Sequence, residues 1–270
     1  MKKTFFCLLL FFLFVAPAKA SAEINYFYKD YKNLIGRQTF ASPLKIKTPQ
    51  IGIVPHHLPT ASPMLDNFYL RLKQTRPDIK TFVVIGPDHF EKCRQKFVTT
   101  DESVNTMFGR LTVDQKIFVV LRSAGIKKEA GCFRGEHAIG VQANYIKKFF
   151  PRAQIVPVLL SYSAQKQNFE KPIQALMKNK VDIFVIQSTD FSHYINADKA
   201  NVNDRLSSKW LKELNSGSFT LKQVDSPGTM KLILQLAKTL KLKPEIIDHK
   251  NSFDLGGSFT NTTSYFTVMF

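Results

Sequence analysis

The chain has 270 residues, 44% of them hydrophobic, and its 38 Lys and Arg against 21 Asp and Glu give a formal charge of +17. This length is enough for one large domain with a sizeable core. The basic residues stand in ones and twos, without an arginine-rich arm or a basic stripe interleaved with aromatics, so we expect a solvated basic surface and no nucleic-acid partner.

The first 20 residues have the layout of a secretory signal peptide. Met1–Lys3 is basic, Phe5–Val15 is an unbroken apolar stretch, and Ala18–Ala20 is a small-x-small cleavage site. The apolar stretch is too short to cross roughly 30 Å of hydrocarbon as a helix, which argues against a membrane anchor. We expect cleavage after Ala20, export to the periplasm or the extracellular space, and no stable membrane insertion afterwards. One α/β domain over residues 21–270 would remain, its charge reduced by three lysines from +17 to +14.

Strand-like apolar runs alternate with helical patterns along the mature chain, without an internal repeat or a linker. Strands are predicted at residues 50–54, 80–86, 154–160, 182–187 and 264–270. Helices are predicted at residues 62–74, 113–124, 137–150, 198–214 and from 226 to before 244, with a further helix between 160 and 182. This alternation predicts an α/β fold with a mainly parallel sheet covered by helices on both faces.

Four short segments that follow or lie close to apolar runs hold five of the six histidines. They are Val54–His57, Gly86–His89, Gly135–His137 and Ser188–His193. In an α/β fold, ligands bind outside the carboxyl ends of the strands, and three of these segments lie directly after strands. Imidazoles and carboxylates gathered at that edge make a metal site or an acid–base site.

His56 and His89 are the first candidates for metal ligands, because a neutral imidazole on a short loop after a strand binds iron, copper or zinc well. Structural, hydrogen-bonded histidines are the alternative. His57 competes with His56, and since neighbours on an extended segment point to opposite sides, we expect only one to face the cleft. His137 opens a helix and is a ligand, a proton shuttle or a polar anchor, whereas Glu136 is interpreted as a helix-start carboxylate.

Asp190 and His193 belong to a dense polar segment directly after a predicted strand. An aspartate three residues before a histidine in a tight turn can orient the imidazole or take protons itself. The alternative is a turn in which aspartate and serine side chains bond the backbone. The density of polar groups at this place favours a functional interpretation.

Asp225 comes two residues before Pro227, at the start of the last predicted helix. One interpretation is a helix N-cap, which Asp and Ser before Pro commonly provide. The other makes Asp225 the carboxylate partner of His56 and His89, a 2-His-1-carboxylate triad typical of non-haem iron. The sequence leaves both interpretations open.

Two cysteines remain in the mature chain, Cys93 four residues after His89 and Cys132 five residues before His137. In an oxidising compartment such a pair is a candidate disulfide, and two unpaired thiols are the alternative. The chain contains no glycine-rich phosphate loop, no Gly-x-Ser-x-Gly and no His-Glu-x-x-His, so the usual nucleotide-binding, serine-hydrolase and zincin signatures are missing.

The histidine segments, in this order, resemble the MEMO family, also called protein B of the AmmeMemoRadiSam system. The family pattern is Pro-His, Gly-Pro-Ser-His, Glu-His-Ser and Ser-Asp-Phe-Ser-His. Here the segments read Pro55-His56, Gly86-Pro87-Asp88-His89, Glu136-His137-Ala138 and Thr189-Asp190-Phe191-Ser192-His193. The resemblance covers about residues 51–270 and implies a three-layer αβα sandwich with a mainly parallel or mixed central sheet. That fold is similar to class III extradiol ring-cleaving dioxygenases, which hold Fe(II) with two histidines and a glutamate.

The family's own site is similar, with two histidines and a cysteine as metal ligands, and the histidine positions carry over to His56 and His89. The chain departs from the family at the third ligand. Where the family has Cys-Gly at the start of the late helix, this chain reads Asp225-Ser226-Pro227-Gly228, and no cysteine follows Cys132. Asp225 would restore a dioxygenase-like triad, whereas Pro227 as the equivalent residue would leave the third ligand missing.

The resemblance therefore implies an exported MEMO-like protein with a metal-capable cleft, whose ligand is an unknown small molecule or peptide. If it is an enzyme, we expect oxygen-dependent chemistry with a divalent metal, Fe(II) first and Cu or Zn as alternatives. The expected metal ligands are His56, His89 and Asp225, and the expected acid–base groups are His137, Asp190 and His193. The competing hypothesis is a non-catalytic binding module for a peptide or small anion, which would keep its affinity after chelation. A metal-independent hydrolase is disfavoured because no activated nucleophile is visible.

Overall fold

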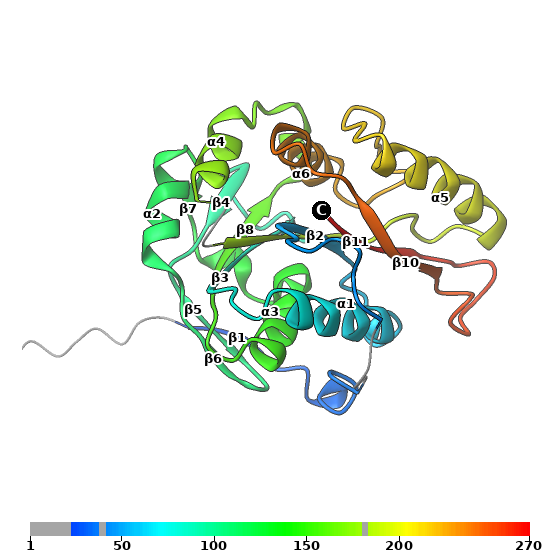
Figure 1. Cartoon of the computed structure of the whole chain (residues 1–270), viewed down its shortest axis with the longest axis horizontal. Coiled ribbons are helices and arrows are strands. Elements are labelled where there is room, and N and C mark those ends of the chain that lie inside the picture. The colour runs from blue at the N-terminus through cyan, green and yellow to red at the C-terminus, as the bar shows by residue number, and fades with distance from the viewer. Residues whose placement is uncertain (1–22, 38–41, 180–182) are drawn as a thin grey trace, which may run out of the picture.

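The computed structural model describes residues 23–37, 42–179 and 183–270 (Figure 1). The expected signal peptide, residues 1–20, lies outside the described residues, as does Asp182 at the start of one predicted strand. No helix within the described residues is long and apolar enough to cross a bilayer.

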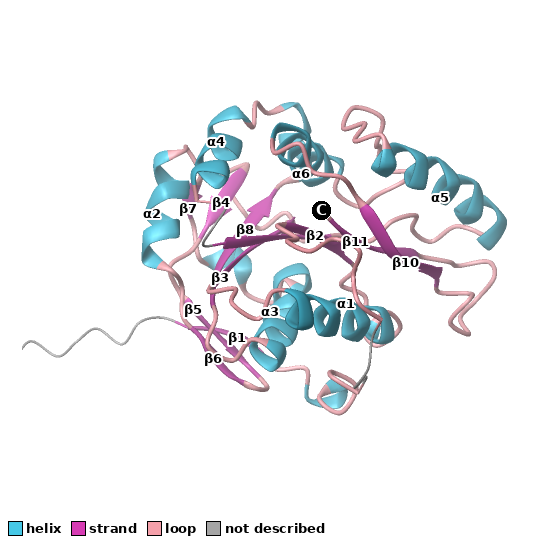
Figure 2. Ribbon diagram, viewed as in Figure 1, coloured by secondary structure: helices cyan, strands magenta, loops and turns pink. Residues whose placement is uncertain are grey.

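Eight strands form a central mixed sheet, which runs through the middle of the molecule (Figure 2). Along the chain they are β2 (Ile51–Val54), β3 (Thr81–Pro87), β4 (Phe97–Thr99), β7 (Lys127–Lys128), β8 (Gln154–Leu160), β9 (Ile183–Ser188), β10 (Glu245–Asn251) and β11 (Ser264–Met269). Their order across the sheet is β10-β11-β2-β9-β3-β8-β4-β7. The four central strands β2, β9, β3 and β8 are parallel, whereas β11 and β4 pair antiparallel with their inner neighbours.

Helices cover both faces of this sheet. One face carries α1 (Ser62–Thr75) and α3 (His137–Phe149), and the other carries α2 (Gln115–Ser123), α4 (Glu170–Lys178) and α6 (Pro227–Thr239). A further helix, α5 (Ala197–Lys212), lies beside β10. A small second sheet packs against α3 and consists of β1 (Glu23–Tyr26), β5 (Ser103–Thr106) and β6 (Gly109–Leu111). The expectation of an α/β three-layer sandwich is confirmed.

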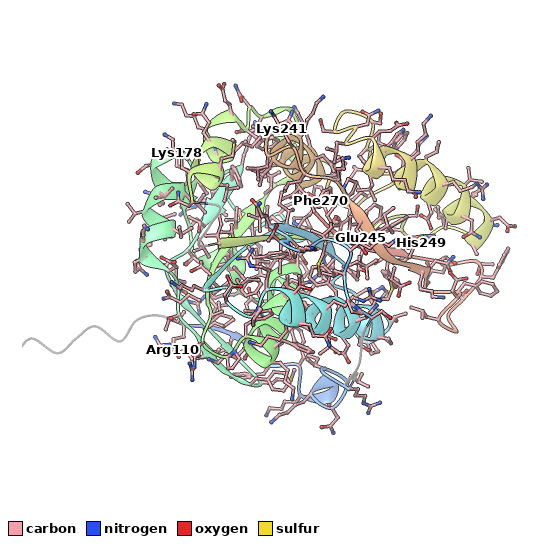
Figure 3. All side chains as sticks on the ribbon, viewed as in Figure 1. Arg110, Lys178, Lys241, Glu245, His249 and Phe270 are labelled. Carbon is pink, nitrogen blue, oxygen red and sulfur yellow. A yellow bond between two sulfur atoms is a disulfide. The ribbon has the colours of Figure 1, made fainter. Side chains whose placement is uncertain are left out.

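The buried apolar runs fill two cores, one on each side of the sheet, and side chains occupy the space between the layers (Figure 3). In β3, Val83 and Ile85 pack toward α2, α4 and α6, whereas Phe82 and Val84 pack toward α1 and α3. Because both faces are covered, the central strands read as continuous apolar runs with no polar alternation.

The predicted helices and strands have counterparts in the described chain, with ends that differ by a few residues. The expected helix between residues 160 and 182 corresponds to α4, preceded by the short 3-10 helix η3 (Tyr162–Lys166). The edge strand β10 was not expected from the sequence. Its residues, Glu-Ile-Ile-Asp-His-Lys-Asn, are mostly half-buried or exposed, so they lack the apolar run that marks the central strands.

A disulfide joins Cys93 to Cys132, with their Cα atoms 5.1 Å apart. Cys93 lies in the loop after β3, and Cys132 lies in the 3-10 helix η2 (Gly131–Phe133), which precedes α3. The two segments linked in this way carry His89 and His137. The bond therefore ties together the two parts of the chain that approach one side of the histidine site.

Candidate metal centre

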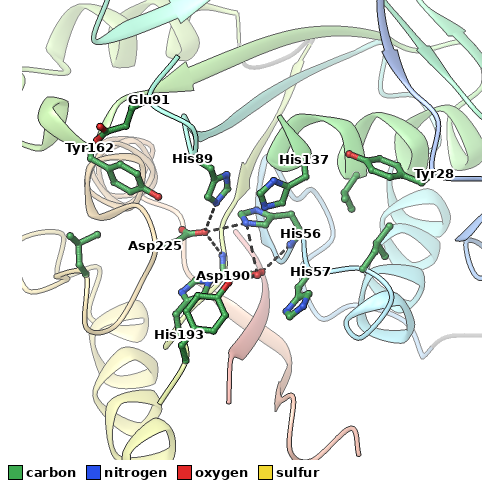
Figure 4. A pocket seen from close by; sticks show the side chains of 14 residues that line it. Tyr28, His56, His57, His89, Glu91, His137, Tyr162, Asp190, His193 and Asp225 are labelled. Carbon is green, nitrogen blue, oxygen red and sulfur yellow. Dashed lines mark hydrogen bonds and ion pairs between the residues drawn. The ribbon is translucent and has the colours of Figure 1, made fainter. Parts of the chain in front are cut away.

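Three neighbouring parallel strands bring the candidate residues to one edge of the sheet. Strand β9 lies between β2 and β3, so the carboxyl ends of all three meet. The loops that leave these ends carry His56 after β2, Asp190 after β9 and His89 after β3, and Figure 4 shows their side chains facing one another. The expectation that strand ends gather these segments therefore agrees with the observed arrangement.

A fixed network orients His56, which is almost completely buried. Its backbone N–H donates to Asp190 Oδ1 at 3.0 Å, and its ring Nδ1 lies 3.2 Å from Ser188 Oγ. Ser188 Oγ also accepts a hydrogen bond from Gln142 Nε2 at 3.0 Å. A hydroxyl oxygen has two lone pairs, so it can accept from His56 Nδ1–H as well, while Nε2 faces the cavity and the Asp225 carboxylate.

A buried carboxylate, Glu136, orients His89. Its Oε1 lies 2.7 Å from His89 Nδ1, and its Oε2 accepts from the His89 backbone N–H at 2.9 Å. Glu136 also caps α3 by accepting from Ala138 N–H at 3.0 Å, so its expected place at the helix start is observed. Burial alone would raise the pKa of Glu136, but the bonds from His89 and Ala138 lower it, which keeps this residue a carboxylate.

Close packing of α3 against β3 places His137 over His89. A Cβ atom at Gly86, near the end of β3, would lie only 2.8 Å from the Ala138 Cβ. Glycine at this position therefore lets the first turn of α3 approach the strand end. The rings of His89 and His137 stack with centroids 4.2 Å apart.

The three imidazoles of His56, His89 and His137 form a group that could hold a metal ion, with one ring nitrogen from each within 4.8 Å of the others. His56 meets the other two rings edge-on, at centroid distances of 4.8 Å to His89 and 4.9 Å to His137. Burial, and then the charges of His56 and His89, lower the pKa of His137 to about 4. His137 is therefore a neutral imidazole at neutral pH, the form that binds metals.

Asp225 reaches the same group from the segment before α6. Its Oδ2 lies 3.2 Å from His56 Nε2 and 3.6 Å from His89 Nε2 (Figure 4). Burial would raise the pKa of Asp225, but the hydrogen bonds with the two histidines lower it well below its usual range. Burial alone would lower the pKa of His89, but the hydrogen bonds to Asp225 and Glu136 outweigh burial and raise it to about 10.

The interpretation of Asp225 as a helix N-cap is wrong. Ser226 occupies the N-cap position of α6, and no side-chain bond caps the helix there. The Asp225 carboxylate instead accepts from the Asp190 backbone N–H at 3.0 Å and from the Thr189 hydroxyl. These two donors turn the carboxylate away from its own helix and toward the histidines.

Asp190 connects His56 to the outer part of the site. Its Oδ2 lies 3.9 Å from His56 Nε2 and 3.8 Å from His193 Nε2. The expectation that only one of His56 and His57 faces the cleft is wrong, since both line the cavity. The alternation rule fails because the chain leaves the sheet at Val54, and the His57 Nδ1 turns to the Tyr265 hydroxyl at 2.7 Å.

A cavity of about 720 Å³ opens over these residues. Its lining consists of aromatic, imidazole, carboxylate and apolar side chains: Tyr28, His56, His57, Leu58, His89, Glu91, His137, Val141, Tyr162, Asp190, His193, Tyr194, Leu221 and Asp225. Of the described residues that line it, none is a lysine or an arginine. The cavity is large enough for a small organic molecule next to the imidazoles.

Sequence reasoning missed several residues that shape the site. Ser188 and Thr189 hold His56 and Asp225, and their position directly after an apolar strand is a signal that could have found them. Asp88 is buried and accepts from the backbone N–H groups of Lys92 and Cys93, which fixes the loop after His89. Tyr28 enters the cavity from the N-terminal segment, and no pattern in the sequence pointed to it.

Known proteins include relatives of this chain in sequence and in fold. A MEMO1 family protein of Pyrobaculum aerophilum is 26% identical over 72% of this chain and 73% of its own length. Another, from Sulfolobus acidocaldarius, is 27% identical over 87% of this chain and 89% of its own. The crystal structure of an uncharacterized protein of Escherichia coli K12 is similar in fold, with a TM-score of 0.53, 14% identity and coverage of 82% of this chain and 99% of that one.

A model of the family described as Memo-like protein matches residues 20–269, nearly the whole chain. The match spans the four histidine segments and the helices and strands that position them. The resemblance seen in those segments is confirmed, and the chain belongs to the Memo-like protein family.

Proposed function

We propose that this chain is an exported, metal-dependent oxidoreductase that uses Fe(II) and dioxygen on a small organic substrate. The observation that carries the proposal is the convergence of His56, His89 and Asp225 at the floor of a cavity. Two imidazoles and one carboxylate, which leave other coordination positions of the metal open, are the ligand set of non-haem iron oxygenases. Family membership alone would not support an enzyme, so the proposal depends on this site.

The residues present fit a divalent metal. Ligands with bonds of about 2.1 Å to one metal stand roughly 3 Å apart. The Asp225 Oδ2 lies 3.2 Å and 3.6 Å from the Nε2 atoms of His56 and His89, which agrees with this spacing. The two histidines also have the hydrogen-bond partners that usually orient metal ligands from behind. Ser188 holds Nδ1 of His56, and Glu136 holds Nδ1 of His89. His137 stands beside this set as an acid–base group.

Bound Fe(II) would supply the electrons and the open positions needed to activate dioxygen. The chain itself would orient the substrate and move protons. His193 lies on the cavity wall with Asp190 behind it, so it can take a proton from a substrate hydroxyl while the carboxylate stabilises the imidazolium. The tyrosines Tyr28 and Tyr162 offer hydroxyl groups to a polar substituent on the substrate.

The decisive experiment compares oxygen uptake with ligand binding. Protein loaded with Fe(II) is expected to consume oxygen with a catechol-like compound, and to stop when a chelator removes the metal. His89→Ala is expected to abolish this uptake, whereas His249→Ala, at a histidine outside the cavity, keeps it. Binding that survives chelation, with no oxygen uptake in any sample, would contradict an enzyme and support the binding module.

Export is supported by the N-terminal layout and by the Cys93–Cys132 disulfide, since such bonds persist in oxidising compartments. Expression of the full chain in a Gram-negative bacterium is expected to release a product by osmotic shock that begins at Ser21. Mass spectrometry of that fraction checks this expectation. A full-length chain that is retained in the cytoplasm, with Cys93 and Cys132 reduced, would contradict it.

A further inference from the structure

A second cavity, of about 690 Å³, lies next to the histidine site. The two cavities share His193 and Leu221, which form their common wall. The second one runs along the first turns of α5 and is lined by Ile195, Asp198, Lys199, Val202, Asn203 and Lys222 in addition to the shared pair. The two cavities therefore lie next to each other, with the imidazoles in the first.

Exposed apolar side chains gather along the two neighbouring cavities. Tyr194 is 73% exposed and lines the first cavity, Leu221 is 58% exposed at the common wall, and Val202 is 49% exposed in the second. Tyr194 also has a φ of +52°, in the left-handed region that non-glycine residues rarely adopt. Exposed apolar surface and local strain of this kind commonly mark a binding surface.

The charged residues that line the first cavity, at the histidine end, differ from those that line the second cavity, at the far end. At the histidine end the carboxylates Asp190, Asp225 and Glu91 stand among imidazoles, so the charges there are of both signs. The second cavity is lined by two lysines, Lys199 and Lys222, and by a single carboxylate, Asp198. Because positive charge exceeds negative charge only in the second cavity, a molecule with one negative group is favoured with that group there and with its uncharged part toward the histidines.

We propose that the substrate is an elongated soluble carboxylate with an apolar body. Its carboxylate would lie at Lys199 and Lys222, its body would pass Leu221, and its uncharged end would reach the imidazoles. This inference deepens the proposed function and rests on it for the chemistry at that end. The recognition of the body and of the carboxylate needs no bound metal.

Two probes of equal chain length and opposite charge, dodecanoate and dodecyltrimethylammonium, test this recognition. Calorimetry on the mature chain with a chelator present, below the micelle concentrations, is expected to show saturable binding of dodecanoate at least tenfold tighter than that of the cation. Dodecanoate is also expected to shift the ring NMR signals of His193. Equal binding of both probes, or no saturable binding of dodecanoate, would overturn the proposal.

Reversing the charge of the two lysines tests where the carboxylate of dodecanoate binds. Lys199→Glu/Lys222→Glu is expected to weaken dodecanoate binding at least tenfold. The control Lys178→Glu/Lys238→Glu changes the net charge equally on α4 and α6, and is expected to leave binding unchanged (Lys178 is labelled in Figure 3). Equal affinities of the two double variants would overturn the assignment, as would binding to anionic vesicles without binding of free dodecanoate. Because the chelated protein is used, these results are independent of whether the histidines bind metal.

Discussion

Asp225→Asn is expected to lower the affinity for Fe(II) by more than about 100-fold, a larger loss than the 10–100-fold typical of an outer partner. Asparagine keeps the shape of the side chain but removes the negative charge that stands 3.2 Å from His56 Nε2 and 3.6 Å from His89 Nε2. A neutral amide is a weaker ligand for a hard divalent cation. Titration of metal-free protein with Fe(II) under anaerobic conditions measures the effect.

The matched control is His137→Gln, at the third imidazole of the group. If Asp225 completes the triad, this variant keeps most of its metal affinity, and the loss appears in proton transfer. The reverse outcome, in which Asp225→Asn binds normally and His137→Gln does not, would show that the three histidines hold the metal. It would contradict the role proposed for Asp225.

Glu136→Gln is expected to weaken metal binding by about 10–100-fold although Glu136 is not itself proposed as a ligand. The carboxylate holds His89 Nδ1 at 2.7 Å and so directs Nε2 toward the metal site. An amide in its place removes the charge and points N–H donors at other N–H donors, which also costs about 1–3 kcal/mol of folding stability. Metal titration and urea unfolding measure the two effects separately.

Glu129→Gln provides the control for that variant. Glu129 lies seven positions earlier and accepts from the backbone N–H groups of Arg94 and Gln95, but it does not line the cavity. Its replacement is expected to leave metal affinity unchanged. Unchanged affinity in Glu136→Gln as well would mean that His89 is oriented without the carboxylate, and that Glu136 serves only to cap α3.

The sequence was most informative where a general rule links chain position to space. His56, His89 and Asp190 follow apolar runs, and parallel strands place such residues at one edge of the sheet, so their convergence could be predicted. The apolar runs themselves predicted the central strands because those strands are buried on both faces. Both predictions depend on burial, which leaves a strong pattern in the sequence.

Features that depend on long-range contacts could not be predicted in this way. Asp225 before Ser226 and Pro227 is typical of a helix cap, and only the donors at Thr189 and Asp190 turn its side chain to the site. Glu136 was recognised as a helix-start carboxylate, but its bond to His89 spans 47 positions. Local sequence preferences show which residue types suit a helix start. The role of such a residue depends on hydrogen-bond partners that are distant in the sequence.

The central claim is that this cavity is built around a bound metal ion, and metal content tests it most directly. The chain without residues 1–20, purified without chelators or a histidine tag, would be analysed by mass spectrometry beside the His56→Ala/His89→Ala variant. Near-stoichiometric iron in the parent and none in the variant is the predicted result. No metal in either protein, even after reconstitution with Fe(II), would contradict the claim.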